Sequence, residues 1–417
     1  MNPTMRGLIV IHPSVDYAKW IIEAGEEAVF VVGPDQASAF QDLDNVICLN
    51  KLSLASVSRA LQAYGRVHGV QYSGVTCFVC EYLPLAAELA GAMALPFPTA
   101  EVVHRSRNKD LAYTGWTASG VPTPASLRIN DVADLGAFAE KHAGPWVLKP
   151  ADGTGSAWVS RVDDANDLAN TYASQSQCAA AERGGEQTSF LIQSFVSGRE
   201  VSADFYIDGE ILSVLRVSAK LKSDRLGEVV AYYPAVTEVN ERQAITDVLR
   251  SAAQGLGLQR GLANADLMLT TSGPMVLEMA MRPGGDCLPD LCRAAHGYDP
   301  IHEACRVARG LSPRSEQPWV DHVAFAAVHL MSDHVGVIEH VSFEDLIADP
   351  TVISCEPYVV MGDTLDPSSG RYEDRIVGAC LIRVDSVEDL EQRAPRLIDK
   401  VNLRARINAP REVAVMS

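Results

Sequence analysis

The chain has 417 residues with 35 basic and 53 acidic side chains, which gives a formal net charge of −18. That length predicts two to three domains at roughly 150 residues each, and a composition with 47% hydrophobic and 21% charged residues is typical of globular proteins. The acidic excess, without any lysine or arginine run, argues against nucleic acid or an anionic membrane as a partner, and no apolar stretch approaches the ~20 residues that cross a bilayer.

The beginning of the chain and its cysteines predict a reduced, cytoplasmic protein. A strand-like run starts at residue 7, where a secretory signal peptide would show a basic leader, a longer apolar core and a cleavage site. The nine cysteines are odd in number and scattered through apolar segments, which is typical of packed thiols. Cys77 and Cys80 form the one close pair. No second pair completes a zinc site, so two buried strand residues are the better interpretation.

Residues 1–97 alternate strand-like and helical patterns and predict a first α/β domain. The strand-like runs are 7–11, 28–33, 45–49 and 75–80, and the helical patterns are 15–25, 53–64 and 84–93. Continuous apolar strands in such an alternation predict a mostly parallel sheet that is covered on both faces. No G-x-G-x-x-G fingerprint follows the first strand, so a dinucleotide site is not predicted.

Residues 98–318 and 319–417 form the second and third predicted domains. Strand-like runs of the second are 146–149, 157–162, 190–196, 200–207, 210–217, 229–234, 262–270 and 275–281. Its helical patterns are 108–119, 164–174, 238–256 and 286–309. Turn signals between several of these strands favour antiparallel pairing. The third domain combines strands at 323–330 and 377–384 with a helical patch at 386–399, and segment 216–236 is expected to be a mobile loop that closes over a substrate.

A lysine at a strand end, followed by a small flexible loop, is the first candidate phosphate-binding feature. Lys149 ends a strand-like run, and the loop residues that follow are Gly153, Thr154, Gly155 and Ser156. Glycines allow backbone N–H groups to turn toward a phosphate, and the lysine adds a positive charge. The P-loop pattern is absent, and a plain turn between strands is the commoner explanation of such a loop taken alone.

Two further segments offer contacts for a nucleotide. Lys109 starts a helix and can approach the same polyphosphate, although a solvated lysine in a first helical turn is the commoner case. Glu200 follows a hinge between two strands and can accept hydrogen bonds from ribose hydroxyls. The local sequence is explained equally well if Glu200 is simply an exposed glutamate beside a β-turn. The hinge suits the edge and faces of a purine, and its residues are Gln193, Ser194, Phe195 and Val196.

Two acidic residues, Asp266 and Glu278, interrupt otherwise hydrophobic strands that a short turn joins. An uncompensated carboxylate would be costly in such strands. A divalent cation between the two removes their repulsion, and hard oxygen ligands favour Mg²⁺ or Mn²⁺. Metal binding is therefore favoured over the alternative that both acids face solvent. Arg282, four residues further on, suits a bidentate clamp on a phosphoryl or carboxylate group.

The order of these parts resembles the ATP-grasp superfamily. The resemblance rests on Lys109, on Lys149 with the glycine loop, on the hinge with Glu200, and on Asp266 and Glu278 with the segment 282–285. It covers the whole chain and implies a fold of α/β and α+β class. The implied domains are a preATP-grasp Rossmann-like domain (1–97), a two-lobed ATP-grasp domain (98–318, with a lid lobe at about 113–195) and a C-terminal α+β extension (319–417) that completes the substrate site.

The resemblance also implies a role for each candidate residue. Lys109, Lys149 and the loop of Gly153, Thr154, Gly155 and Ser156 would hold the phosphates of ATP. The hinge of Gln193, Ser194, Phe195 and Val196 would bind adenine, and Glu200 would bind ribose. Asp266 and Glu278 would hold Mg²⁺ or Mn²⁺. Many members have an asparagine where this chain has Ala280, so a second metal ion would have fewer protein ligands.

Within the superfamily, the E-x-x-x-R-x-G-G ending and the long C-terminal unit are similar to the L-amino-acid ligase branch. Members of this branch join a carboxylate to an amine through an acyl phosphate, release ADP and phosphate, and often form homodimers. Arg282 and Lys149 would then be catalytic, because they neutralise charge on the transferred phosphoryl group. Gly284, Gly285 and Asp286 would lie at the acceptor pocket, and Asp286 equally fits an N-cap of a helix at 287–295.

The expected function is therefore an ATP-dependent ligase that acts on small molecules, namely an amino acid or other carboxylate and an amine. Two alternatives remain open. The same fold can use a non-amino-acid acid or a carrier-bound acceptor, or the chain can be an ATP-binding regulator without catalysis. A nicotinamide-dependent oxidoreductase is opposed by the missing fingerprint after the first strand.

Overall fold

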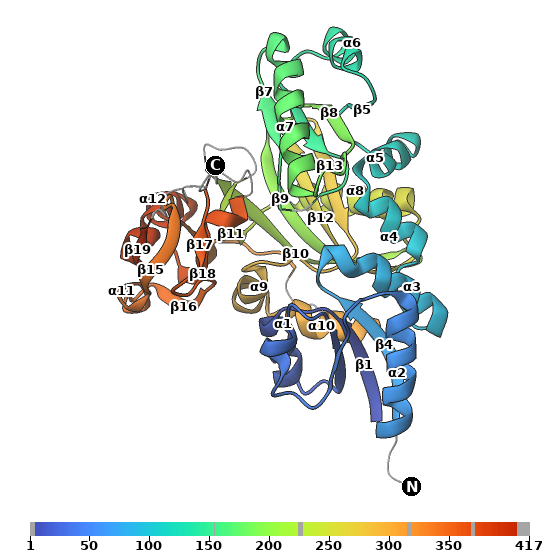
Figure 1. Ribbon diagram of the computed structural model, residues 1–417. Coiled ribbons are helices and arrows are strands. Elements are labelled where there is room, and N and C mark those ends of the chain that lie inside the picture. Colours follow the sequence, from blue (N-terminus) through green and yellow to red (C-terminus); the bar gives the residue numbers. More distant parts are fainter. Residues whose placement is uncertain (1–4, 154, 224–227, 315–317, 368–371, 407–417) are drawn as a thin grey trace, which may run out of the picture. The chain divides into compact units, whose positions relative to one another are not determined.

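The computed structural model describes residues 5–153, 155–223, 228–314, 318–367 and 372–406 (Figure 1). They form two compact units, each built from segments far apart in the sequence. The first unit comprises Met1–Pro124, Val196–Val217 and Thr237–Trp319, and the second comprises Ala125–Phe195, Ser218–Val236 and Val320–Ser417. The division into three consecutive domains stays a prediction. Among the described residues, no helix combines the length and apolarity needed to span a membrane.

A parallel four-stranded sheet begins the first unit, in the order β3-β2-β1-β4. Its strands are β1 (Met5–Ile11), β2 (Ala28–Val32), β3 (Val46–Cys48) and β4 (Val70–Cys77). The helices between them are α1 (Val15–Glu23), α2 (Leu54–His68) and α3 (Leu83–Met93), with 3₁₀ turns at Ala37–Phe40 and Cys80–Tyr82. This confirms the predicted parallel sheet. β4 begins five residues earlier than expected, because polar Gln71 and Ser73 interrupt its apolar pattern.

The rest of the first unit is an antiparallel arrangement in the order β13-β12-β9-β10. Its strands are β9 (Arg199–Asp208), the first part of β10 (Ile211–Lys222), β12 (Arg260–Thr270) and β13 (Gly273–Ala280). Its helices are α4 (Ala100–Arg107), α5 (Lys109–Ala118), α8 (Val239–Leu256), α9 (Leu288–His296) and α10 (Pro300–Ala308). The buried Trp116 fixes α5 to α8, because its Nε1 donates to the Ala252 carbonyl oxygen at 3.0 Å.

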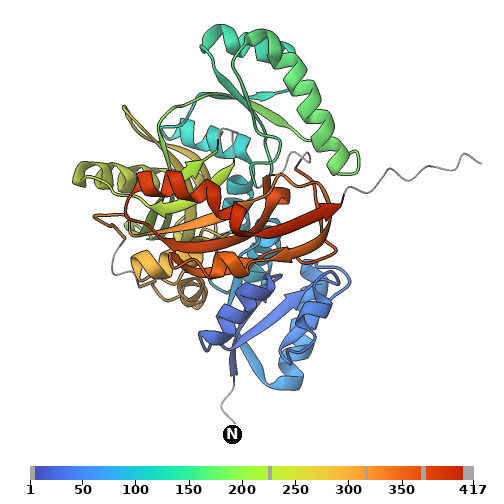
Figure 2. The same cartoon turned by 90° about the vertical axis from the view of Figure 1, so that its left-hand side faces the viewer.

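The second unit contains a four-stranded antiparallel sheet in the order β5-β8-β6-β7. Its strands are β5 (Ser126–Ile129), β6 (Trp146–Pro150), β7 (Ser160–Val162) and β8 (Phe190–Ser194). Helices α6 (Ala133–Lys141) and α7 (Leu168–Glu182), with a 3₁₀ turn at Ala165–Asp167, accompany this sheet in both views (Figures 1 and 2). Trp146, Leu148, Phe190 and Ile192 form the centre of its core.

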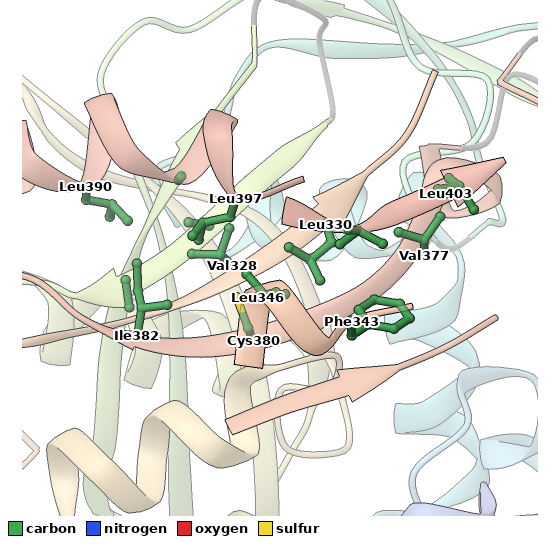
Figure 3. Close-up of a cluster of buried hydrophobic side chains, with 14 of the residues drawn as sticks. Val328, Leu330, Phe343, Leu346, Val377, Cys380, Ile382, Leu390, Leu397 and Leu403 are labelled. Atoms are coloured by element: carbon green, nitrogen blue, oxygen red, sulfur yellow. The ribbon is translucent and has the colours of Figure 1, made fainter. Parts of the chain in front are cut away.

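The C-terminal part of the second unit continues β10 with four strands in the order β11-β14-β18-β16. These strands are β11 (Val229–Pro234), β14 (Phe325–Met331), β18 (Ile376–Arg383) and β16 (Val352–Pro357). A smaller sheet joins β17 (Thr364–Leu365), β15 (Gly336–Ser342) and β19 (Asn402–Arg406). Short helices are α11 (Glu344–Ile347) and α12 (Val387–Arg393), with 3₁₀ turns at Tyr372–Arg375 and Ala394–Lys400. Side chains such as Val328, Leu330 and Ile382 fill the core between them (Figure 3).

Two sequence-based expectations need correction. Segment 216–236 is not a mobile loop over most of its length, because it supplies the end of β10 and all of β11, whose side chains are buried or half-buried. Residues 224–227 lie outside the described residues. The helical patch 386–399 is divided into α12 and a 3₁₀ turn, because Pro395 cannot continue an α-helix. The combination of α/β and α+β architecture itself is confirmed.

Candidate functional site

The two acidic residues singled out in the sequence face each other in the structure. Asp266 of β12 and Glu278 of β13 are cross-strand partners, which places both half-buried side chains on the same face of the sheet. A register shift follows directly after Asp266. Opposed carboxylates repel each other, so this pairing favours a cation between them.

Lys109 supplies one positive charge at this place. Its Nζ lies 3.3 Å from Glu278 Oε1, and its side chain is only 11% exposed. It begins α5, where the Asn108 side chain accepts the Leu111 N–H as an N-cap, and the Tyr113 hydroxyl fixes the helix to β13 through the Leu277 carbonyl oxygen at 2.6 Å. The alternative that Lys109 is a solvated residue in a first helical turn is therefore wrong.

β9 extends the same polar face. Glu200, Ser202 and Asp204 alternate along this strand, and Ser202 is the cross-strand partner of Asp266. Glu200, the candidate ribose-binding residue, is half-buried on this face. The structure thus gathers Lys109, Glu200, Asp266 and Glu278 on one face of the first unit.

A buried ion pair that the sequence did not reveal lies next to these residues. The side chains of Arg216 and Asp204 are both 0% exposed, and two hydrogen bonds of 2.9 and 3.0 Å join them. Burial alone would lower the pKa of the arginine, but the facing carboxylate raises that pKa above its ordinary value. Arg216 also donates to the Ser202 carbonyl oxygen, and Asp204 Oδ1 accepts from Asn264 Nδ2 at 2.9 Å and from the Gly284 N–H at 2.8 Å.

Arg282 follows β13 and is half-buried. Its Nε donates to Cys80 Sγ at 3.0 Å, and its Nη1 donates to the Pro283 carbonyl oxygen at 2.8 Å. Burial alone would lower the pKa of Arg282, and the contact with Cys80 raises that pKa above its ordinary value, so the guanidinium stays charged. Cys80 was missed in the sequence, where it was read only as a packed thiol.

The three residues after Pro283 have different environments. Gly284 is packed tightly, since a Cβ there would lie 2.2 Å from Arg216 Nη2. A Cβ on Gly285 would lie 3.2 Å from both Arg282 Nη1 and the Tyr17 hydroxyl. Asp286 is exposed, with φ at 54°, and does not cap the next helix, because α9 begins after Cys287 without a side-chain cap. The N-cap alternative for Asp286 is therefore wrong.

The remaining candidates belong to the second unit, except Val196, which belongs to the first. Lys149 on β6 is buried and stands opposite Leu191 of β8. In the loop after β6, Gly155 and Ser156 have φ of 62° and 51°, and a Cβ on Gly153 would make an ordinary van der Waals contact with Pro150 at 3.8 Å. Thr154 lies outside the described residues.

The hinge residues Gln193, Ser194 and Phe195 end and follow β8. Gln193 is buried opposite Val147, and the Phe195 N–H donates to the Pro145 carbonyl oxygen at 3.0 Å. The Arg161 guanidinium lies 4.4 Å from the centre of the Phe195 ring, a cation–π contact that the sequence did not reveal.

The metal candidates are few. Within the part of the chain that the structure describes, no group of three or more His, Cys, Asp or Glu residues is placed to hold a metal ion. The candidate metal site thus has only two protein ligands in the described part of the chain, the carboxylates of Asp266 and Glu278. Mg²⁺ is commonly bound by one or two carboxylates together with substrate phosphates, so such a set fits a metal that arrives with a nucleotide.

Comparisons with known proteins show which families and folds the chain is similar to. Residues 142–290 match the ATP-grasp domain family. An uncharacterised protein y4rH of Sinorhizobium fredii is 26% identical over 78% of this chain and 68% of its own length. The phosphoribosylamine–glycine ligase of Listeria innocua is 28% identical over 48% of this chain, and the match spans only half the length of that relative. The fold is similar to that of the L-amino acid ligase from Bacillus licheniformis, with a TM-score of 0.76, 19% identity, and coverage of 97% of this chain and 100% of that chain.

Proposed function

We propose that this chain, in which residues 142–290 match the ATP-grasp domain family, is an ATP-dependent ligase of the ATP-grasp superfamily that joins the carboxylate of an amino acid to an amine. The observation that carries the proposal is the polar face of the first unit, where Asp266 faces Glu278 and Lys109 Nζ lies 3.3 Å from Glu278 Oε1. Opposed carboxylates with an adjacent lysine suit a metal-bound polyphosphate. The similarity to an L-amino acid ligase supports an amino acid as the carboxylate substrate.

Asp266 and Glu278 would hold Mg²⁺ or Mn²⁺ through their carboxylate oxygens. A metal held there would supply positive charge that offsets the charge of the nucleotide phosphates. In the first unit, Lys109 would contact the phosphates and Glu200 the ribose hydroxyls. In the second unit, Lys149 and the loop 153–156 would contact phosphates, and hinge residues Gln193–Phe195 the adenine, with Val196 of the first unit continuing the hinge.

The reaction would proceed in two displacements. A carboxylate oxygen of the first substrate attacks the γ-phosphorus of ATP, the bond to the β-phosphate oxygen breaks, and ADP leaves. The amine nitrogen then attacks the acyl carbon, loses a proton, and expels inorganic phosphate. Arg282 would orient the carboxylate and balance charge on the transferred phosphoryl group, because a guanidinium pairs with such groups through two parallel hydrogen bonds.

The proposal is tested by measuring ADP and phosphate release from purified protein with ATP, Mg²⁺ and a panel of amino acids. A carboxylate labelled with ¹⁸O should transfer one labelled oxygen to inorganic phosphate. Label in AMP, or no transfer, would exclude the acyl phosphate. If no amino acid in the panel causes ADP release while ATP still binds, the chain would be an ATP-binding regulator without catalysis. Turnover only with other acids or with a carrier-bound acceptor would favour a ligase of the same fold that does not act on amino acids.

The metal assignment predicts the effect of Glu278→Gln. This change removes one anionic ligand and the partner of Lys109, so we expect turnover to fall by more than roughly 100-fold and Mn²⁺ binding, followed by electron paramagnetic resonance, to weaken. Glu101→Gln is the matched control, since Glu101 pairs with Arg105 on an exposed surface of the same unit. Full activity of folded Glu278→Gln protein would refute the assignment.

A further inference from the structure

A cavity of about 370 Å³ lies wholly within the first unit. It is lined by the end of β4, the link between α3 and α4, the start of β12, the residues after β13, and α10. Its volume is in the range of small-molecule sites. Most of its lining is apolar and includes Val75, Leu95, Phe97, Leu262, Met281 and Val307.

The cavity adjoins the segment that carries Arg282. Met281, Arg282 and Pro283 all contribute to its wall. Leu262, which also lines it, lies on the same face of β12 as Asp266, because four residues of regular strand separate the two. This separation is about 13 Å along the strand at 3.3 Å per residue. The cavity therefore borders the carboxylate face of the sheet, and Arg282 in its wall is the group that a substrate bound there would contact.

Arg260, the other charged residue in the lining, is already compensated. It donates to the Tyr206 hydroxyl at 3.1 Å and to the Gly310 carbonyl oxygen at 2.7 Å, and Asp208 lies 3.6 Å away. An anionic group inside the cavity would gain little from it. The lining thus favours an uncharged, apolar group.

Arg282 can still bind an anion. Of the five N–H donors of a guanidinium, Nε is used by Cys80 and one donor of Nη1 by the Pro283 carbonyl oxygen. Its other N–H groups have no hydrogen-bond partner in the described ranges. A carboxylate is the natural partner for such donors.

We infer that the carboxylate substrate is an amino acid with a bulky apolar side chain, which enters this cavity while Arg282 binds the carboxylate end. The inference rests on the proposed ligase function and specifies its substrate class. Each buried methylene strengthens binding roughly fourfold. L-Leucine has three more side-chain carbons than L-alanine, so its affinity should be higher by a factor on the order of 50.

The test is calorimetric titration of L-leucine and L-alanine into the protein, with Mg²⁺ and a non-hydrolysable ATP analogue present. Val307 is half-buried on α10 and suits substitution in both directions. Val307→Phe fills the cavity and should weaken L-leucine binding by at least roughly tenfold, with L-alanine changed less than about twofold. Val307→Ala enlarges the cavity and should improve L-phenylalanine relative to L-leucine. Val67→Phe, on the exposed face of α2, is the matched control.

Equal affinity for L-leucine and L-alanine in the unmodified protein would overturn the inference. It would also be overturned if Val307→Phe weakened both ligands equally, or if Val67→Phe had the same effect. Should Val307→Phe fail to fold, Val307→Ala alone decides the question. Because binding is measured without turnover, selective binding of L-leucine without any ADP release would refute the ligase function and leave the apolar ligand class standing.

Discussion

Asp204 links the interior of the first unit to the segment that carries Arg282. Its Oδ1 accepts the Gly284 N–H, two residues beyond the arginine, while Arg216 holds both carboxylate oxygens. Because each group of this pair has a hydrogen-bond partner, the charges can remain buried. The direction in which the chain leaves β13 thus depends on an ion pair outside the proposed reaction.

Arg216→Met should destabilise the protein strongly, because it leaves the Asp204 carboxylate buried and unpaired. We expect the free energy of unfolding in urea to fall by about 3–5 kcal/mol. Arg216→Met combined with Asp204→Leu should recover much of this loss, since no uncompensated charge remains. Arg250→Met removes a partly exposed pair with Asp247 and should cost less than about 1 kcal/mol. A double variant no more stable than Arg216→Met would show that the unpaired charge is not the cause.

Single residues differ in how far the sequence predicts them. Asp266 and Glu278 were predicted because each interrupts an apolar run and a short turn joins the two runs. Asp204 and Arg216 also interrupt apolar runs, but nothing in the sequence pairs them with each other or with Gly284, 80 residues further on. Burial of Lys109 depends on packing of α5 against β13, which the local pattern around Lys109 does not contain.

At the scale of elements, the antiparallel strands arrange the polar residues in two neighbouring rows across the sheet. One row is Glu278, Asp266 and Ser202, and the next is Ala280, Asn264 and Asp204. The Asn264 amide joins the rows, because its Nδ2 donates to Ser202 Oγ and to Asp204 Oδ1, both at 2.9 Å. A side chain at position 280 therefore lies on the carboxylate face, beside Glu278.

Ala280→Asn should strengthen metal binding. The new amide oxygen lies two residues from Glu278 on the same face of β13, where it can serve as a third oxygen ligand. We expect Mn²⁺ affinity, measured by electron paramagnetic resonance with an ATP analogue, to rise on the order of tenfold, equivalent to about 1.4 kcal/mol. Ala280→Leu has similar bulk without the oxygen and should not tighten binding. An equal effect of both variants would place the metal elsewhere.

Elements with strong local patterns were predicted well. The buried strands of the parallel sheet and the β12–β13 hairpin have continuous apolar runs or clear turn residues. Segment 216–236 was predicted to be a mobile loop, whereas Lys220 and Lys222 within it are half-buried in β10. The start of α9 was misread because Asp286 is a good capping residue, although its left-handed backbone excludes that role here.

At the scale of the whole chain, the fold class could be predicted from the sequence. Which segments of the chain belong to each of the two compact units could not. Ala125–Phe195 and Ser218–Val236 belong to one unit with the C-terminal region, while Val196–Val217 between them belongs to the other. Sequence patterns mark the ends of elements, whereas the units depend on contacts between distant segments. A division into consecutive domains follows sequence order, so it does not show that a segment of one unit lies between two segments of the other.

The reduced state expected for the whole chain has a consequence for thiol chemistry. All nine cysteines are free, and only Cys48 and Cys178 of these are exposed. Burial raises the pKa of Cys77 and of Cys380 to about 12, so both remain protonated and unreactive at pH 8, because the thiolate is the reactive form. Titration of the native protein with a disulfide reagent at pH 8 should therefore show two fast thiols, and nine after unfolding in urea. Cys48→Ser and Cys178→Ser should each remove one fast thiol. Of the remaining seven cysteines, six are buried and Cys355 is half-buried, with its pKa raised by burial to about 11. A fast thiol that persists in the double variant would contradict this protection.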